Sequence, residues 1–111
     1  MLPDYVVAGH SDDASGYQAM QQLLRRNPPP DGVFCYNDPV AAGAIKAVLE
    51  AGRNVPKDIA IIGAGNVHYS DLLRVPLSTV DQRSFLIGET AAELLLRCMQ
   101  AKTPPPPERI F

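Results

Sequence analysis

The sequence contains no tryptophan, only two cysteines, and no apolar run long enough to span a bilayer. Cys35 lies in a short apolar run and Cys98 in a stretch of helical periodicity, so the pair predicts reduced thiols and not a disulfide framework. Basic residues are not in excess, since ten Lys and Arg face twelve Asp and Glu. A nucleic-acid surface needs a basic stripe, so this balance argues against DNA binding by the chain alone.

Residues that hold metals or carry out catalysis are also sparse. His10 and His68 are isolated, with no Cys, His or carboxylate at metal-ligand spacing. Gly63-Ala64-Gly65 follows a predicted strand as a dinucleotide-binding loop would, but His68 stands where the third glycine of that motif belongs. No serine lies in a nucleophile elbow. The sequence therefore predicts a binding module without metal or cofactor, and gives no positive sign of an enzyme.

What the sequence does contain is organised around residues 33–63, which predict a strand, a helix and a second strand. The runs 33–36 and 59–62 lack polar alternation, which is typical of parallel strands buried on both faces. Asp38 is expected to cap the helix between them, with Pro39 at its first position. Gly52 is expected to end that helix in the left-handed conformation.

The flanking segments extend this alternation of strands and helices. Residues 5–8 predict a strand, and Asp12 or Asp13 is expected to cap the helix that follows. Residues 69–74 predict one or two helical turns, residues 77–80 a strand, and Ser84 the cap of a long final helix. The order predicts an α/β fold, Rossmann-like, with a mostly parallel sheet flanked by helices.

Ligands of such sheets lie beyond the carboxyl ends of the strands. That rule selects four loops, at residues 9–13, 37–38, 63–66 and 81–83. Helix capping is the simpler interpretation of Asp13 and Asp38. Asn37 and Gln82 have no comparable structural role in the sequence pattern, so we interpret them as candidate ligand residues.

Four signatures occur in order along the chain: Asn37-Asp38 before a helix of small residues, Val55-Pro56 before a strand ending in Gly63, Pro76-Leu77-Ser78-Thr79-Val80-Asp81-Gln82, and Ile87-Gly88 before Ala91. Through them, residues 9–99 resemble the lactose/galactose-repressor (LacI/GalR) family of bacterial transcription regulators. The resemblance implies a cytoplasmic protein with a two-subdomain core like that of type I periplasmic binding proteins. In the family this core binds an effector, and a helix-turn-helix headpiece binds DNA.

The resemblance places this chain in the latter part of that core, as an incomplete piece. Residues 1–82 would belong to the carboxyl-proximal subdomain. Residues 83–111 would form a crossover helix and a proline-rich tail belonging to the other subdomain. The headpiece has no counterpart here, so DNA would be bound only through a headpiece absent from this chain. The implied partners are a small-molecule effector, sugar-like or nucleobase-like, and a second copy of the chain.

The resemblance also implies roles for particular residues. The implied ligand residues are Asn37, Gln82, Asn66 and Ser11. The implied dimer contact consists of Ala41, Ala42, Ile45, Leu72 and Leu73. Two positions depart from the family: the loop 63–65 lacks the usual carboxylate, and Ser11 stands where an aromatic ring often stacks on the ligand. Both departures argue against an ordinary sugar effector.

Two other readings of the same pattern remain open. A solute-binding component of a sugar transport system would share the fold, and a small α/β enzyme of the doubly wound type would share the alternation of elements. The segment preceding Met1 would separate a regulator from a transport component, because the first requires a helix-turn-helix and the second a secretory signal. An enzyme would require a catalytic constellation.

Overall fold

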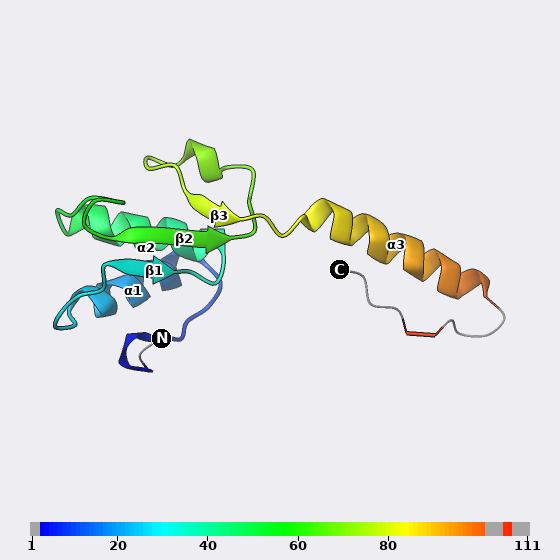
Figure 1. The fold of residues 1–111 in the computed structure, drawn as a ribbon, viewed down its shortest axis with the longest axis horizontal. Helices are drawn as coiled ribbons and strands as arrows, with labels where there is room; N and C mark the ends of the chain where they lie inside the picture. The colour runs from blue at the N-terminus through cyan, green and yellow to red at the C-terminus, as the bar shows by residue number, and fades with distance from the viewer. Residues whose placement is uncertain (1–2, 102–105, 108–111) are drawn as a thin grey trace.

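The structure, a computed structural model, describes residues 3–101 and 106–107 of the 111-residue chain. The elements in order are η1 (Pro3–Tyr5), α1 (Asp13–Leu24), β1 (Gly32–Phe34), α2 (Asp38–Glu50), β2 (Ala60–Ala64), η2 (Ser70–Leu72), β3 (Ser78–Val80) and α3 (Ser84–Gln100). The three strands form one parallel sheet in the order β1-β2-β3 (Figure 1). The predicted α/β class with a parallel sheet flanked by helices is confirmed.

Helices α1 and α2 pack closely against each other and together cover one face of the sheet (Figure 1). Their close approach depends on glycine, because a Cβ at Gly16 would overlap the backbone of Val40 and a Cβ at Gly43 would overlap that of Asp13. The apolar side chains between the two helices and the sheet form a single core. Its buried members are Met20, Leu23, Cys35, Ala41, Ala44, Ile45, Ala47, Val48, Ile59, Ile61 and Leu77.

The other face of the sheet is open in the described part of the chain. Phe34 pairs with Ile62 across β1 and β2, and both side chains are exposed, at 60% and 39%. Val80 on β3 is 48% exposed. The prediction that the strands are buried on both faces is therefore wrong: successive side chains alternate between a helix-covered face and an uncovered one.

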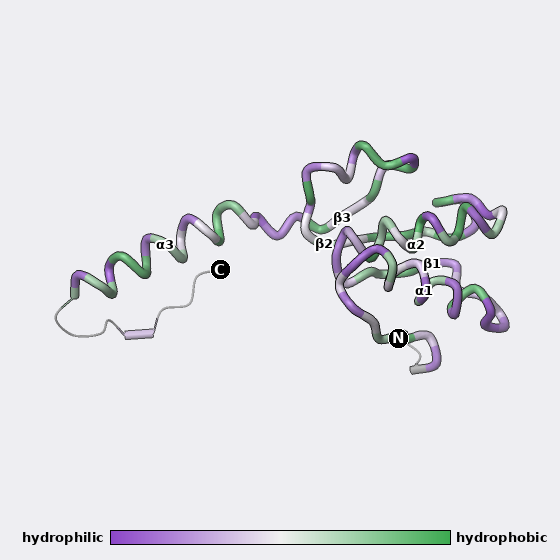
Figure 2. Tube along the Cα trace, turned by 180° about the vertical axis from the view of Figure 1, so that it is seen from behind, coloured by the Kyte–Doolittle hydropathy of each residue, from purple (hydrophilic) through white to green (hydrophobic). Residues whose placement is uncertain are grey.

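Helix α3 extends away from the sheet, and none of its residues is buried (Figure 2). Arg83, with a φ of 51°, precedes it in the left-handed conformation and makes no side-chain cap. Ser84 is the first helical residue, so its prediction as the cap is wrong. The exposed large apolar residues of α3 are Phe85, Leu86, Ile87, Leu95, Leu96 and Met99. The described chain measures 61 × 32 × 21 Å, longest through this helix.

Local signals elsewhere have mixed outcomes. Asp12 caps α1 by accepting a 2.7 Å hydrogen bond from the Ser15 N–H, and Gly52 takes a positive φ of 73° after α2, both as predicted. Residues 5–8 do not form the predicted strand. Tyr5 ends η1, its hydroxyl donates to the carbonyl of Pro28, and residues 6–8 are irregular. Much of the proline-rich tail, residues 102–105 and 108–111, lies outside the described residues.

Candidate functional site

The parallel strands bring the predicted ligand loops to one edge of the sheet, because all three strands end on the same side (Figure 1). The connection from β1 carries Asn37 into α2, and the connection from β2 carries Asn66. Gln82 follows β3 and is exposed between the sheet and α3. Ser11 precedes α1 and is also exposed. This edge is therefore the candidate effector site.

Asn37 is the N-cap of α2, a role that the sequence interpretation gave to Asp38. Its side-chain oxygen accepts a 2.9 Å hydrogen bond from the Val40 N–H, and its amide nitrogen donates to the carbonyl of Ser11 at 3.0 Å. The structure thus joins two of the predicted ligand residues. A primary amide has two N–H donors and two acceptor lone pairs, so one of each remains for a ligand. Asn37 and Asp38 are both good caps, and the sequence alone does not rank them.

Asp38 instead lies wholly inside the protein, with 0% of its surface exposed. Its Oδ2 atom accepts from the backbone N–H of Val67 at 2.9 Å and from the hydroxyl of Ser70 at 3.3 Å. Its Oδ1 atom accepts from the hydroxyl of Thr79 at 2.5 Å. These partners lie far along the chain, so no local sequence signal pointed to them. Sequence reasoning missed Asp38 as the centre of this network.

Asn66 lies in the loop that the Asp38 network holds. Its backbone N–H donates to the Thr79 hydroxyl at 3.2 Å, and its φ of 50° is left-handed, a conformation that Asn tolerates better than most residues. Beyond β3, the Asp81 carboxylate accepts from the Arg83 N–H at 2.7 Å, which fixes the backbone on both sides of Gln82. The predicted ligand residues therefore form two groups, Ser11 with Asn37 and Asn66 with the Thr79–Asp38 pair, while Gln82 lies in the connection to α3.

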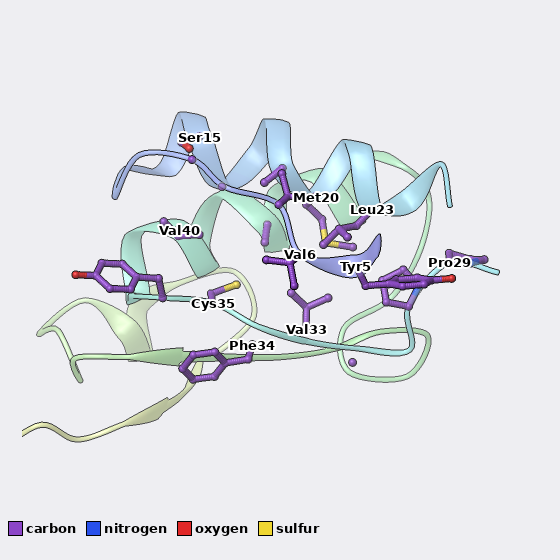
Figure 3. A pocket seen from close by; sticks show the side chains of 18 of the residues that line it. Tyr5, Val6, Ser15, Met20, Leu23, Pro29, Val33, Phe34, Cys35 and Val40 are labelled. Atoms are coloured by element: carbon purple, nitrogen blue, oxygen red, sulfur yellow. The ribbon is translucent and has the colours of Figure 1, made fainter. Parts of the chain in front are cut away.

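A cavity in the described part of the chain overlaps only one of these loops, at residues 9–11. It has a volume of about 990 Å³ and runs beside β1, between that strand, α1 and residues 5–7. Figure 3 shows Tyr5, Val6, Met20 and Val33 around it. Ser11 is the one predicted ligand residue in its lining. Because the lining is mainly apolar and a ligand site needs a few convergent polar groups, we place the candidate site at the loops.

A second hollow, of about 390 Å³, lies over the outer side of α2. It is lined by Ala42, Ile45, Lys46, Leu49, Glu50, Leu73 and Arg74. Three of the residues implied in a dimer contact, Ala42, Ile45 and Leu73, thus lie together here. Leu72 is 81% exposed, whereas Ala41 is wholly buried in the core and presents no surface to a partner.

Two further features concern chemistry and location. Among residues 3–101 and 106–107, no three His, Cys, Asp or Glu side chains gather as metal ligands. Both cysteines are free; burial raises the pKa of the Cys35 thiol to about 11, whereas Cys98 is exposed on α3. None of the helices in the described part of the chain is long and apolar enough to cross a bilayer.

Comparison with known proteins assigns the chain to a family. Residues 2–111 match the family described as periplasmic binding protein-like domain. The transcriptional repressor PurR of Pasteurella multocida is 40% identical over 101 residues, covering 91% of this chain and 30% of the relative. PurR of Mannheimia succiniciproducens is 40% identical over 95 residues, covering 86% of this chain and 28% of the relative. The chain thus spans about a third of the length of such relatives.

Solved structures give the same assignment. The complex of the transcriptional regulator CelR with cellobiose superposes with a TM-score of 0.86 at 30% identity, over 96% of this chain and 33% of that one. The lac repressor dimer bound to operator and the anti-inducer ONPF gives 0.78 at 33% identity, over 83% of this chain and 28% of that one. The chain belongs to the periplasmic binding protein-like family and corresponds to part of the effector-binding domain of LacI-type transcription regulators.

Proposed function

We propose that the chain supplies one wall of a small-molecule effector site, formed by Ser11, Asn37, Asn66 and Gln82. The observation that carries this proposal is the Asn37–Ser11 hydrogen bond at the carboxyl edge of the parallel sheet, which leaves one amide N–H and one lone pair of Asn37 unused. The effector class is sugar-like or nucleobase-like. This class is suggested by two relatives: CelR, whose solved structure is a complex with cellobiose, and the PurR repressors.

The two departures from the family pattern narrow the choice of effector. The loop Gly63-Ala64-Gly65 brings no carboxylate to the site, and the nearby carboxylate of Asp38 is buried and already accepts three hydrogen bonds. Ser11 provides a hydroxyl in place of a stacking ring. A ligand held here would therefore be recognised by neutral amide and hydroxyl groups.

A titration followed by ¹H–¹⁵N NMR tests the effector site. Cellobiose, lactose and adenine are added separately, to millimolar concentration, because one wall of a site binds weakly. Binding at the proposed site shifts the amide signals of Ser11, Asn37, Asn66 and Gln82 together, with the Asn37 side-chain NH₂ pair among them. Asn37→Asp serves as the variant, since it keeps the cap oxygen but loses the amide donors. Shifts confined to residues 5–7, α1 and β1, or no shift with any of the three compounds, contradict the proposal.

The remaining parts of the proposal concern partners and location. The chain is a cytoplasmic, non-catalytic piece of a regulator, its residues 1–82 and 83–111 belonging to different subdomains. It contacts DNA only through a headpiece elsewhere in such a regulator. The named relatives are transcription regulators, which supports a binding role over an enzymatic or transport role. A second copy would dock on the hollow over α2, which contains Ala42, Ile45 and Leu73. A solved relative, the lac repressor, is a dimer, which supports association with a second copy.

A further inference from the structure

The carboxylate of Asp38 is the one charged group buried at the candidate site, and its partners in the described part of the chain are neutral donors. An isolated buried charge is costly unless hydrogen bonds compensate it. The two oxygens of Asp38 bind two different segments of the chain. Oδ2 holds the loop after β2, through Val67 and Ser70, and Oδ1 holds strand β3, through Thr79.

Thr79 extends the network from the carboxylate to Asn66. Its hydroxyl has one proton, which it donates to Asp38, and its lone pairs accept the Asn66 N–H at 3.2 Å. The conformation of Asn66 is thereby fixed from one side by Thr79 and from the other by the Val67 N–H on Asp38. A residue at positive φ needs such support, because the left-handed region is sparsely populated outside glycine.

The chain itself carries the network to the two other parts of the site. Asp38 directly follows Asn37, the cap of α2. Thr79 lies two residues before Asp81, whose carboxylate accepts from Arg83 at the start of α3. One buried carboxylate thus connects the N-terminus of α2, the Asn66 loop and the connection that carries Gln82.

We propose that Asp38 is a positioning residue for the effector site. It does not touch the effector; through Thr79 and Val67 it holds Asn66 and the Gln82 connection in register with Asn37. The proposal rests on the proposed function, because it assigns these residues to one site. It goes further in predicting that a change at the Asn37 end is transmitted to Arg83, just before α3, through the Asp38–Thr79 and Asp81–Arg83 hydrogen bonds and the backbone that joins them.

Thr79→Val and Thr79→Ser form the matched pair that tests it. Valine keeps the size of threonine but has no hydroxyl, whereas serine keeps the hydroxyl and loses a methyl group. In the unliganded protein, Thr79→Val removes both the hydrogen bond to Asp38 and the acceptor of the Asn66 N–H. It should therefore speed amide hydrogen exchange at Asn66 and Val67 by about tenfold and shift the NMR signal of the Arg83 amide. Thr79→Ser should stay within about twofold of the wild type at both amides. Asp38→Asn should speed amide hydrogen exchange at Asn66 and Val67 more than Thr79→Val does.

The ligand titration gives a second, separate readout. With cellobiose, lactose or adenine, whichever shifts the Asn37 amide, Thr79→Val should weaken binding by about fivefold to tenfold and Thr79→Ser should restore it. Unfolding in urea is measured for both variants. If Thr79 had a merely structural role, Thr79→Val would lower the free energy of unfolding, but the two variants would bind the ligand with the same affinity. Unchanged exchange at Asn66 and Val67 in Thr79→Val overturns the positioning role. Absence of any ligand shift in the wild type counts against the proposed function alone, since the exchange experiment needs no ligand.

Discussion

The side chain of Asn37 reaches the backbone of Ser11, 26 residues earlier in the chain, at 3.0 Å while it caps α2. One amide therefore joins the loop before α1 to the first turn of α2. Asn37 therefore has a structural role as well as its proposed ligand role. Its oxygen caps α2, and its nitrogen holds the loop before α1.

Two substitutions of Asn37 separate the contribution of the cap oxygen to stability from that of the hydrogen bond to Ser11. Asn37→Ala should lower the free energy of unfolding by about 0.5–2 kcal/mol, because it removes the cap of α2. Asn37→Asp should cost less, since the carboxylate still accepts from the Val40 N–H, while its second oxygen faces the Ser11 carbonyl without a proton to donate. Urea unfolding followed by circular dichroism measures both variants. Equal losses for the two substitutions would show that the bond to Ser11, and not the cap, dominates.

Gly63 on β2 should not tolerate a side chain. A Cβ there would overlap Oδ1 of Asp38 and come within 3.2 Å of the Leu77 side chain and 3.3 Å of the Ala41 side chain. Gly63→Ala should therefore destabilise the protein by about 1–3 kcal/mol, the usual cost of overpacking.

Gly32→Ala is the matched control for Gly63→Ala, because a Cβ at Gly32 meets nothing within 4 Å. It should be neutral or slightly stabilising, since alanine reduces the conformational entropy of the unfolded chain. Thermal unfolding of the two variants beside the wild type provides the comparison. A Gly63→Ala protein as stable as Gly32→Ala would mean that Asp38 moves aside at little cost.

The two thiols should differ sharply in reactivity. Burial raises the pKa of Cys35 to about 11, and the thiolate is the reactive form. At about pH 8, Ellman's reagent should therefore modify Cys98 quickly and Cys35 only after the protein unfolds. Cys98→Ser should abolish the fast phase and leave the slow one. A fast phase that survives in Cys98→Ser would show that the region around β1 opens readily.

Much of this architecture follows from local sequence signals, and the exceptions have a common cause. The cap of α1 and the left-handed Gly52 depend on their immediate neighbours, so the pattern alone predicts Gly52 and limits the cap to Asp12 or Asp13. The strand expected at residues 5–8 needs a neighbouring strand, and none pairs with it in the described part of the chain. Whether Phe34 is buried depends on a helix over the second sheet face, which an apolar run does not reveal.

The candidate site shows the same division. Asn37 and Asn66 follow from the rule that ligand loops lie at strand ends. The role of Asp38 does not, because its partners Val67 and Thr79 lie 29 and 41 residues away. At the start of α2 two good caps are adjacent, and Asn37 forms the cap because both carboxylate oxygens of Asp38 accept hydrogen bonds from distant residues. Tertiary hydrogen bonding, and not capping preference, decides between them.

Asp58 should make stability depend on pH at the acid end. The hydrogen bond from the Asn54 backbone N–H, at 2.7 Å, and then that from its side chain lower the pKa of Asp58. A carboxyl whose pKa is depressed on folding stabilises above its unfolded pKa of about 3.9 and loses that contribution as pH falls through the folded value. Asp58→Ala should thus be less stable than wild type at neutral pH, and the difference should vanish in acid.

Urea titrations at a series of pH values measure this difference for Asp58→Ala. Lys57→Ala is the control, because it removes only a smaller coulombic contribution to the lowered pKa of Asp58 and leaves both hydrogen bonds from Asn54 in place. Its stability should follow the wild type across the series more closely than that of Asp58→Ala. A stability gap for Asp58→Ala that stays constant into acid would contradict the assignment.

The hollow over α2 should hold a second copy of the chain. Ala42, Ile45, Leu49 and Leu73 give it an apolar surface, with Lys46 and Glu50 beside them, and Leu72 stands 81% exposed next to Leu73. Burying one leucine contributes about 1.5–3 kcal/mol, so a self-complementary contact here would be favourable. Leu72→Asp should shift the protein to monomer in sedimentation equilibrium at micromolar concentration, without a loss of fold, because that side chain already faces water.

Leu95→Asp, at a position of α3 that is 61% exposed, distinguishes this surface from the apolar face of α3. If copies meet over α2, Leu95→Asp remains dimeric while Leu72→Asp dissociates, because the new charge must be desolvated only at the contact. The reverse result would assign association to α3, whose apolar side chains have no cover in the described part of the chain. A wild-type protein that is monomeric at micromolar concentration, with both variants unchanged, would remove the hollow as an interface and leave Leu72 an exposed side chain without a partner.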